Sequence, residues 1–284
     1  MCSCHTSKYR WKFENAKYLS FKSAYIFDFV IYKIKSGKGK DWIILVHGLG
    51  EHCGRYKQLI KMFNDEGFAV YTFDWPGHGK SGGKRGYAKV EDGIRIIDEI
   101  VDEIGEKPLI FGHSLGGLTV IRYAEVHPDK IKGTVASAPS IAKPRDTSKF
   151  SVGLAKFLGI ILPKMTINNT IDPHTLSRNG EAVKNYIDDP LVHDRISLAL
   201  ARSLFVNIEK VNEGAGKITK PLLILNGTED VLSPIEGARN FMKKLKIKDK
   251  TLREFEGAYH EIFEDPEWAD EFHKTIVEWI KSHE

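Results

Sequence analysis

The amino-acid sequence predicts a protein of the α/β class, with a mostly parallel, doubly wound sheet and an inserted, mainly helical cap. Three observations support this prediction. Short runs rich in β-branched and aromatic residues alternate with amphipathic helical patterns along most of the chain. Most of these runs are almost continuously apolar, as central parallel strands are when helices cover both faces of a sheet. The alternation stops between residues 139 and 212, where helical or loop-like sequence intervenes.

The strands can be placed in order along the chain. The first, "YIFDFVIYKI" over 25–34, alternates between apolar and polar residues and is expected to be an exposed antiparallel strand. The runs expected to form the other strands cover 42–48, 68–74, 108–112, 133–139, 221–227 and 251–257. Helical periodicity lies between them, over 54–66, 90–104, 115–127, 234–245 and 267–282. This regular alternation predicts a doubly wound sheet.

A single domain with one insertion is the expected organisation. The chain has 284 residues, of which 42% are hydrophobic, so it can bury a sizeable core. No internal repeat or low-complexity linker separates two halves. Residues 1–138 and 213–284 are therefore expected to form the core, and residues 139–212 the cap.

The composition excludes several classes of function. The net charge is only +4 and acidic and basic residues are mixed along the chain, so no basic stripe indicates a nucleic-acid partner. Cys2, Cys4 and Cys53 form no pair of Cys-x-x-Cys motifs, which predicts reduced thiols in a cytoplasmic protein without a structural metal. The amino terminus lacks a signal-peptide pattern, and no apolar run approaches the roughly 20 residues of a membrane span. Any membrane contact is therefore expected to be peripheral.

The stretch "LIFGHSLGGL" over 109–118 carries the strongest functional signal. Glycine costs entropy in regular structure and supplies no side chain, so Gly112, Gly116 and Gly117 indicate a sterically demanding turn around Ser114. A strand, Gly-x-Ser-x-Gly and a helix describe a nucleophile elbow, a strained turn that exposes a serine at the carboxyl end of a sheet. The alternative is a glycine-rich turn with an incidental serine. The context between a strand and a helix favours a nucleophilic serine.

A serine hydroxyl needs a base, and the base needs an orienting acid. Among the carboxyl-terminal histidines, His273 lies in a helical run and His283 beside the terminus, and both are expected to be solvated. His260 lies in the loop after the last predicted strand, where it can reach the nucleophile. The loop "GTEDVLSP" offers both Glu229 and Asp230 as the acid. Asp230 is preferred, and Glu229 remains the alternative.

An oxyanion intermediate needs backbone N–H donors. One donor is expected from Leu115, directly after the nucleophile. The stretch "LVHGLGEHCGRY" over 45–56 follows a predicted central strand, and Gly48 and Gly50 let this backbone approach a ligand with the N–H of Leu49 pointing inward. A purely structural turn is the alternative for this loop.

Two other glycine-rich matches do not indicate a nucleotide. The stretch "GHGKSG" over 77–82 matches a dinucleotide-binding pattern, but it continues into "GKRGY" and does not open a helix. The "GKS" at 79–81 is part of a phosphate-binding pattern, yet Asp74 occupies the position of the first glycine that this pattern requires. We expect neither a nucleotide nor another cofactor.

From about residue 18 to residue 282, the chain resembles the monoglyceride lipase and lysophospholipase-like branch of the α/β-hydrolases. The resemblance is carried by "HGLGEHCGRY", "FDWPGHGKSGG", "GHSLGG", "LSRN" with "YIDDPLV", "GTEDVLSP" and "EGAYHEIFED". It implies an α/β-hydrolase fold and a cap that forms an acyl tunnel. It also implies a triad of Ser114, Asp230 and His260, with oxyanion donors at Leu49 and Leu115.

The same resemblance implies candidate residues for the glycerol end of a substrate. Arg55 and Tyr186 are candidates, and the alternatives are an ion pair for Arg55 and packing within the cap for Tyr186. Some bacterial relatives place a cap acid against the glycerol hydroxyls, and Glu181 is the nearest candidate for that position.

The cap contains a strongly apolar stretch, "SKFSVGLAKFLGIILPKM" over 148–165. Its apolar side is broader than a single core-facing stripe requires. One interpretation is a cap helix packed on the core. The preferred interpretation is a helix, including Phe157 and Leu158, with one side on the acyl tunnel and the other on lipid, its lysines near head groups. This interpretation predicts peripheral membrane association.

The chain is therefore predicted to be a serine hydrolase that cleaves monoacylglycerols to glycerol and fatty acid through an acyl-enzyme on Ser114. One alternative is a broader carboxylesterase or lysophospholipase. Another is a non-catalytic α/β-hydrolase relative that serves as a receptor or scaffold, because a fold does not fix a function. The complete set of nucleophile, acid and base disfavours this last alternative.

Overall fold

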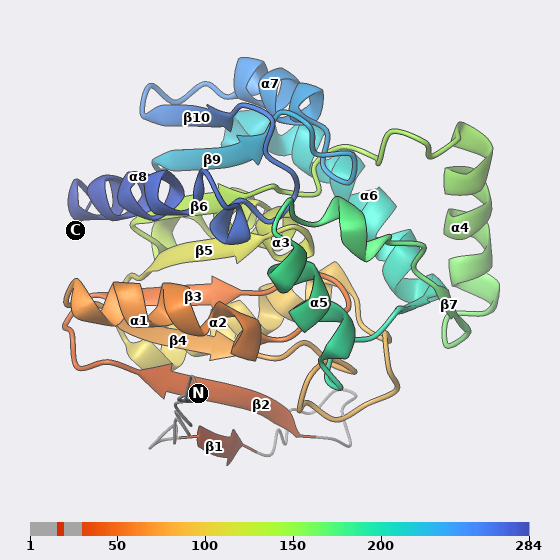
Figure 1. Ribbon diagram of the computed structural model, residues 1–284, viewed down its shortest axis with the longest axis horizontal. Helices are drawn as coiled ribbons and strands as arrows, with labels where there is room; N and C mark the ends of the chain where they lie inside the picture. Colours follow the sequence, from red (N-terminus) through yellow and green to blue (C-terminus); the bar gives the residue numbers. More distant parts are fainter. Residues whose placement is uncertain (1–15, 20–29, 284) are drawn as a thin grey trace, which may run out of the picture.

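The computed structural model describes residues 16–19, by their backbone alone, and residues 30–283. Within these residues, the main feature is an eight-stranded sheet with the strand order β1-β2-β4-β3-β5-β6-β9-β10 (Figure 1). The strands are β1 (Ala16–Leu19), β2 (Ile31–Ser36), β3 (Trp42–Val46), β4 (Ala69–Phe73), β5 (Leu109–His113), β6 (Gly133–Ser137), β9 (Leu222–Gly227) and β10 (Lys250–Phe255). β2 runs antiparallel to β1 and β4, and the other neighbouring pairs are parallel. The predicted mostly parallel sheet is confirmed.

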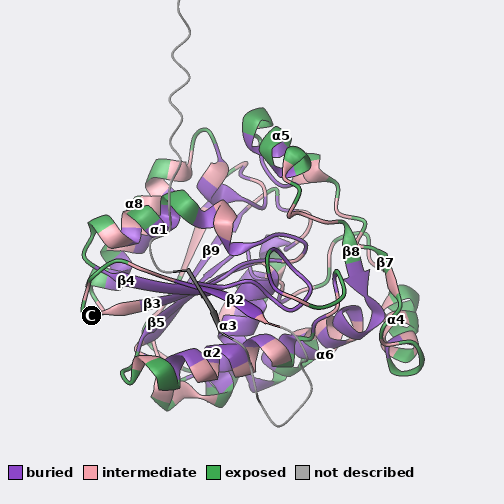
Figure 2. Cartoon of the chain, turned by 90° about the horizontal axis from the view of Figure 1, so that it is seen from below, coloured by how far each residue is buried: buried purple, intermediate pink, exposed green. Residues whose placement is uncertain are grey.

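Helices cover both faces of the sheet. They are α1 (Lys57–Asp65), α2 (Val90–Ile104), α3 (Leu115–Val126), α7 (Ile235–Lys244) and α8 (Ala269–Lys281). Alternate side chains of β3 enter two cores: Ile44 and Val46 pack with residues of α2, α3 and α7, and Ile43 and Leu45 with residues of α1 and α8. The central strands are therefore buried on both faces (Figure 2). This burial explains why they are continuous apolar runs.

The observed elements agree with the predicted ones within a few residues, except at the amino-terminal side. Of the strand predicted over 25–34, residues 25–29 lie outside the described residues, and β2 begins at Ile31. β2 is antiparallel as predicted, but the expectation of exposure is wrong, because residues 31–34 are buried and β1 pairs with the outer edge of β2. β1 itself was not predicted. The helix expected over 54–66 begins with a 3₁₀ turn, η1 (Cys53–Tyr56).

The connection between β6 and β9 is mainly helical, as predicted. It holds α4 (Lys149–Ile161), β7 (Thr166–Asn168), η3 (Pro173–Thr175), α5 (Gly180–Asp188), β8 (Arg195–Ser197), α6 (Leu198–Gly214) and η4 (Ala215–Lys217). β7 and β8 pair into a small antiparallel sheet that was not predicted, because strands of three residues are too short to show a period. α6 continues past residue 212, so the division of the chain into core and cap stays a prediction.

α4 lies at the edge of the molecule, away from the sheet, and packs on α6 (Figure 1). The two helices approach closely at Gly159, where a Cβ would lie 2.5 Å from Leu198 O and 2.5 Å from Arg202 Cβ. The opposite face of α4 carries exposed apolar side chains at helical spacing: Phe150, Leu154, Phe157 and Ile161. Among the described residues, no helix is long and apolar enough to cross a bilayer.

Candidate active site

Ser114 lies at a sharp turn between β5 and α3. Its backbone has a φ of 55°, in the left-handed region that residues with a side chain rarely adopt. The neighbouring glycines are explained by close backbone contacts, because a Cβ on Gly112 would clash with Gly116 O and a Cβ on Gly116 would clash with Val46 O. The helix therefore starts directly against the strand, as in a nucleophile elbow.

The Ser114 hydroxyl lies beside a second serine. Ser114 Oγ is 3.4 Å from Ser140 Oγ, and the Ser140 N–H donates to Ser114 O at 3.1 Å. Ser140 belongs to the turn that follows β6, the neighbour of β5 in the sheet. The nucleophile candidate is thus held by the ends of two adjacent parallel strands, where sites of doubly wound folds lie.

His260 and Asp230 form a buried pair. His260 Nδ1 lies 2.8 Å from Asp230 Oδ2. Asp230 follows β9, and its other carboxylate oxygen accepts the N–H groups of Leu232 and Ser233, both at 2.8 Å. Glu229, the alternative acid, is exposed. Burial alone would lower the pKa of His260, but the Asp230 carboxylate, and after it Glu261 and Glu51, raise the pKa above the ordinary value. This pairing suits a base that must become charged.

A further ring, that of His113, packs on His260 directly before Ser114 in the chain. His113 directly precedes Ser114, and its ring centroid lies 4.7 Å from that of His260. Burial, and after it the neighbouring His260, holds the pKa of His113 well below the ordinary value. The Nδ1 atom of His113 lies 3.2 Å from Ser137 Oγ. His113 is therefore a neutral ring on which the base packs.

The remaining carboxyl-terminal histidines make other contacts. The half-buried ring of His273 packs on Phe272 within α8. The His283 ring stacks on Trp279 with centroids 4.1 Å apart, and its Nε2 lies 3.0 Å from Asp249 Oδ2. Both histidines are therefore only partly exposed, so they are less solvated than expected.

The loop after β3 lies against Ser114. A Cβ on Gly48 would lie 3.2 Å from Ser114 Cβ, and Gly50 has a φ of 77° and touches a carbonyl oxygen of the β6–β9 connection. Leu49 is half-buried between these glycines, and Leu115 is buried at the first position of α3. The structure thus places the loop that contains Leu49 against Ser114, and Leu115 directly after it. Their role in holding an oxyanion stays a prediction.

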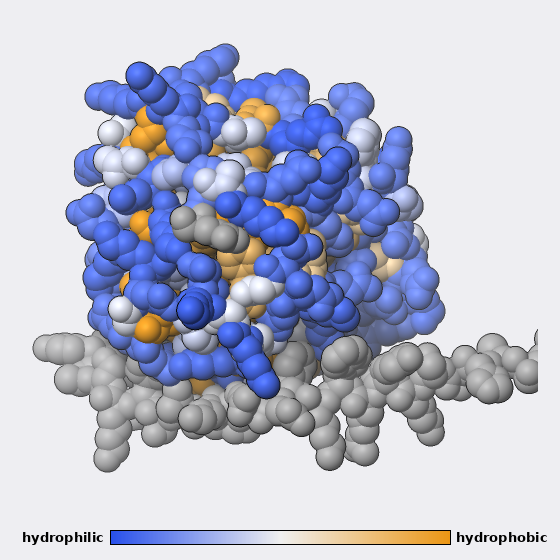
Figure 3. Space-filling view, turned by 90° about the vertical axis from the view of Figure 1, so that its left-hand side faces the viewer, coloured by the Kyte–Doolittle hydropathy of each residue, from blue (hydrophilic) through white to orange (hydrophobic). Residues whose placement is uncertain are grey.

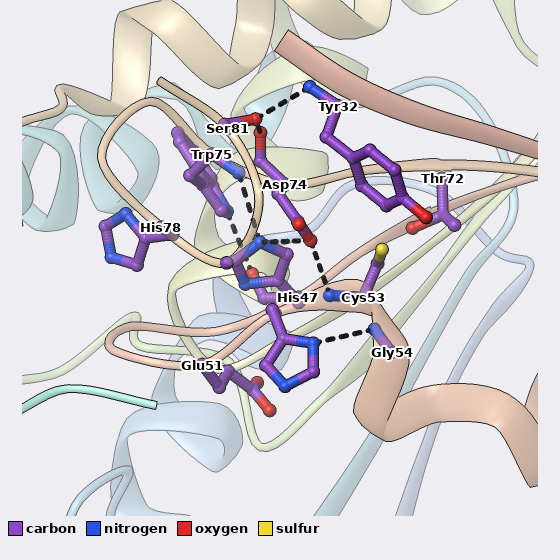
Figure 4. Close-up of polar contacts among 12 residues, drawn as sticks. Tyr32, His47, Glu51, Cys53, Gly54, Thr72, Asp74, Trp75, His78 and Ser81 are labelled. Atoms are coloured by element: carbon purple, nitrogen blue, oxygen red, sulfur yellow. Dashed lines mark hydrogen bonds and ion pairs between the residues drawn. The ribbon is translucent and has the colours of Figure 1, made fainter. Parts of the chain in front are cut away.

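The turn after β4 holds this loop from one side (Figure 4). The Trp75 N–H donates to His47 Nε2 at 3.1 Å, and the Trp75 indole N–H donates to His47 O at 3.0 Å. Asp74 Oδ1 accepts the N–H of Cys53 at 2.8 Å. Burial lowers the pKa of His47, which suits a neutral ring that accepts a hydrogen bond. Residues 77–82 form turns and open no helix, as their sequence predicts.

Buried charges hold the same loop from a second side. Glu51 accepts hydrogen bonds from the Gly48 N–H at 2.6 Å, from the Tyr56 hydroxyl at 2.6 Å and from Arg55 at 2.7 Å. Arg55 also forms a two-point contact with Glu261, at 2.6 and 2.9 Å. Burial alone would raise the pKa of Glu51, but Arg55 lowers it, so Glu51 is ionised. Because Glu261 directly follows His260, these contacts join the loop after β3 to the loop of His260.

The β6–β9 connection holds the loop from a third side. Asp189, at the end of α5, has its Oδ2 atom 2.9 Å from His52 Nε2. The His193 N–H donates to Gly50 O at 2.8 Å. A Cβ on Gly50 would lie 2.5 Å from His193 O. Only glycine fits this position, because both the positive φ and the neighbouring carbonyl exclude a side chain.

The candidate substrate-binding residues fall into two groups. Tyr186, buried on α5, lies over Arg55 with its ring centroid 4.7 Å from the guanidinium carbon. The structure therefore brings Arg55 and Tyr186 together beside the site, with Arg55 already paired to two carboxylates. Glu181 is exposed in the first turn of α5, while Phe157 is exposed and Leu158 half-buried on α4. A substrate role for each of these residues stays a prediction.

Sequence reasoning missed several residues of the site. Glu51 lies four residues before Arg55 in "HGLGEHCGRY", a spacing that suggests an ion pair, so Glu51 could have been found as the partner of Arg55. Glu261 lies 206 positions from Arg55, and no local pattern relates them. Ser140 is a loop serine without a motif, and only the fold places it beside the nucleophile.

The chain is similar to known lipases over most of its length. The family model described as serine aminopeptidase, S33, matches residues 37–267. The monoacylglycerol lipase of Mycolicibacterium smegmatis is 33% identical over 85% of this chain and 88% of the relative. The monoglyceride lipase of Mus musculus is 34% identical over 86% of this chain and 84% of the relative. The crystal structure of the Paleococcus ferrophilus monoacylglycerol lipase is 58% identical, with a TM-score of 0.88, over 89% of this chain and 99% of that one.

Proposed function

This chain belongs to the α/β-hydrolase family described as serine aminopeptidase, S33, in its monoglyceride lipase branch, and we propose that it hydrolyses monoacylglycerols to glycerol and a fatty acid. One observation carries the proposal. In a chain whose relatives are named for this activity, a buried His260–Asp230 pair with a 2.8 Å contact packs against the ring of His113, the residue directly before a strained elbow serine. These are the groups that an ester-cleaving serine nucleophile requires.

The proposed mechanism assigns one role to each group. Asp230 engages Nδ1 of His260, so Nε2 is the nitrogen left to accept the proton of Ser114 as its Oγ attacks the ester carbonyl. The N–H groups of Leu49 and Leu115 stabilise the oxyanion. His260 then gives the proton to the glycerol oxygen as the ester C–O bond breaks. Water attacks the acyl-enzyme, His260 takes its proton, and the fatty acid leaves as that proton returns to Ser114.

A substrate panel tests this proposal. Monoacylglycerols of graded chain length are compared with matched lysophospholipids and a short soluble ester. We expect the highest kcat/KM on a monoacylglycerol, and covalent labelling of Ser114 by a fluorophosphonate. A higher kcat/KM on lysophospholipids or on the short ester would favour the lysophospholipase or the broader carboxylesterase instead. Failure to label would favour the non-catalytic receptor or scaffold.

We also propose that α4 contacts lipid peripherally. Phe150, Phe157 and Ile160 are 78%, 59% and 65% exposed, and apolar residues exposed together on one surface often mark a protein or membrane contact. Lys149 and Lys164 are exposed near the two ends of this helix, where cations can meet anionic head groups. The face at the other side of the molecule, seen in Figure 3, is mostly hydrophilic with scattered apolar residues. An apolar helix face of this kind suits a substrate that is dissolved in a membrane or micelle.

Liposome flotation tests this contact. We expect wild-type protein to float with anionic liposomes, and less so at high salt, because salt screens the lysines. Phe157→Ser should weaken flotation and lower monoacylglycerol turnover more than turnover of a short soluble ester. Val126→Ser, which replaces an exposed apolar residue at the end of α3, is the matched control and should float like wild type. Wild-type protein that ignores liposomes would contradict the contact.

A further inference from the structure

Two buried carboxylates share one buried guanidinium next to the proposed base. The side chains of Glu51, Arg55 and Glu261 are only 4%, 10% and 3% exposed. One cation between two anions leaves a net charge of −1. An unbalanced buried charge is costly unless another group is stabilised by it. The proposed mechanism has so far given this charge no role.

We propose that Glu51, Arg55 and Glu261, here called the buried trio, position His260 and stabilise its protonated form during the reaction. Their net negative charge favours the imidazolium that forms when His260 takes the proton of the nucleophile. Their hydrogen bonds tie the backbone at Gly48, beside the nucleophile, to the loop of the base. These are positioning residues, because they act through His260. The inference rests on the proposed function, which makes His260 the base.

The buried trio is rigid and shielded from water. The Glu261 N–H donates to Leu176 O at 2.7 Å, which fixes the backbone directly after His260. The ring of Tyr186 covers the guanidinium of Arg55 at 4.7 Å. In such a water-poor environment, charges interact more strongly than they do at the surface. Replacing one carboxylate should therefore change the stability of the protonated form of His260.

The effect of the trio on the base has a definite sign. The titratable groups that face His260 come from four segments: Asp230 after β9, Glu261 in the loop of His260 itself, Glu51 and Arg55 after β3, and His113 of β5. Burial lowers the pKa of His260, whereas Asp230, then Glu261 and Glu51, raise it. The positive charge of Arg55 balances the negative charge of only one of the two carboxylates of the trio. The neutral His113 adds no charge. Removing one carboxylate of the trio should therefore lower the pKa of the base.

The test is the pH profile of kcat/KM for a soluble short ester. The acid limb reports protonation of the free base, because only neutral His260 can take the proton of the nucleophile. In Glu261→Gln the trio becomes neutral, so the limb should move to lower pH. The plateau should fall roughly tenfold, because the imidazolium of the transition state loses about 1.4 kcal/mol of stabilisation. A simple structural defect would lower the plateau and leave the limb in place.

Matched variants separate charge from structure. Glu267→Gln removes a carboxylate from the same loop, one that pairs with Arg178 and is 62% exposed, and should leave the limb unmoved. Arg55→Lys keeps the charge but loses the two-point contact, and should also leave the limb unmoved. If Glu261→Gln does not fold, the pH profile of Glu51→Gln is measured in its place. This variant should fold, because the amide oxygen of glutamine can still accept the N–H of Gly48.

The outcomes distinguish the two proposals. A limb that stays at its wild-type position in both Glu261→Gln and Glu51→Gln overturns the role of the buried trio and leaves the proposed function standing. A shift of equal size in Glu267→Gln also overturns it, because the effect would then be one of general surface charge. Wild-type protein without turnover dependent on Ser114 overturns the proposed function, and this inference with it.

Discussion

At the scale of single residues, the environment decides which of two adjacent carboxylates can orient the base. Asp230 is fully buried with one oxygen on His260 and the other on two backbone N–H groups, whereas Glu229 is exposed. We expect Asp230→Asn to lower kcat/KM by roughly 10⁴-fold, because the amide cannot stabilise the imidazolium. Glu229→Gln should remain close to wild type. Ester turnover of the two purified variants measures this, and a larger loss in Glu229→Gln would assign the acid to Glu229.

The nucleophile and base can be tested against a histidine with no proposed role. Ser114→Ala and His260→Ala should each fold and lose several powers of ten in turnover, because the groups act as one unit. His273→Ala should be nearly silent, because its ring packs on Phe272 within α8. Turnover and melting temperature are compared for all three variants. Near-wild-type turnover in Ser114→Ala would exclude the acyl-enzyme mechanism.

The residues that sequence reasoning found differ in kind from those it missed. Ser114 and His260 could be predicted because a local motif and the chain order of the family identify them. The contact between Arg55 and Glu261 joins positions 206 apart, and the neighbour of Ser114 across the sheet, Ser140, is set by strand order. Such contacts depend on the tertiary structure, which local spacing does not encode.

At the scale of elements, the periodicity of apolar residues predicted the long helices and strands but not the shortest strands. α2 was predicted over 90–104 and spans those residues, because one face packs on the core and the other meets solvent. β7 and β8 have three residues each and show no period. The helix over 148–165 was predicted with an apolar side on lipid, but sequence could not show that Gly159 is the point of contact with α6.

Two glycines of α4 test how this helix is held. A Cβ on Gly153 would meet nothing within 4 Å, so Gly153→Ala should raise the melting temperature, because alanine favours helix by about 1 kcal/mol. Gly159→Ala should lower it, because the new Cβ would lie 2.5 Å from the backbone oxygen of Leu198 and would push α4 off α6. Thermal unfolding of both variants decides. Equal shifts in the two variants would show that α4 does not depend on its contact with α6.

At the scale of the whole molecule, the inserted segment and the core share a partly buried polar network. Asn207 of α6 accepts a hydrogen bond from Arg122 Nε of α3 at 3.1 Å and donates to Glu91 of α2 at 2.9 Å. Asp189 and His193 also contact the loop beside the nucleophile. Although the sequence places α6 largely within the predicted cap, these contacts tie it to two helices of the core. We therefore expect the core and the inserted segment to unfold together.

Asn207→Ala tests this coupling. The substitution removes the acceptor of the buried Arg122 Nε, and leaving a buried donor unsatisfied costs roughly 1–3 kcal/mol. We expect a single calorimetric transition, lowered by several degrees, because loss of the shared network weakens both parts at once. Asn185→Ala, at an exposed position of α5, is the control and should melt like wild type. Two separated transitions in wild type or in Asn207→Ala would instead show that the segment between β6 and β9 folds as a unit of its own.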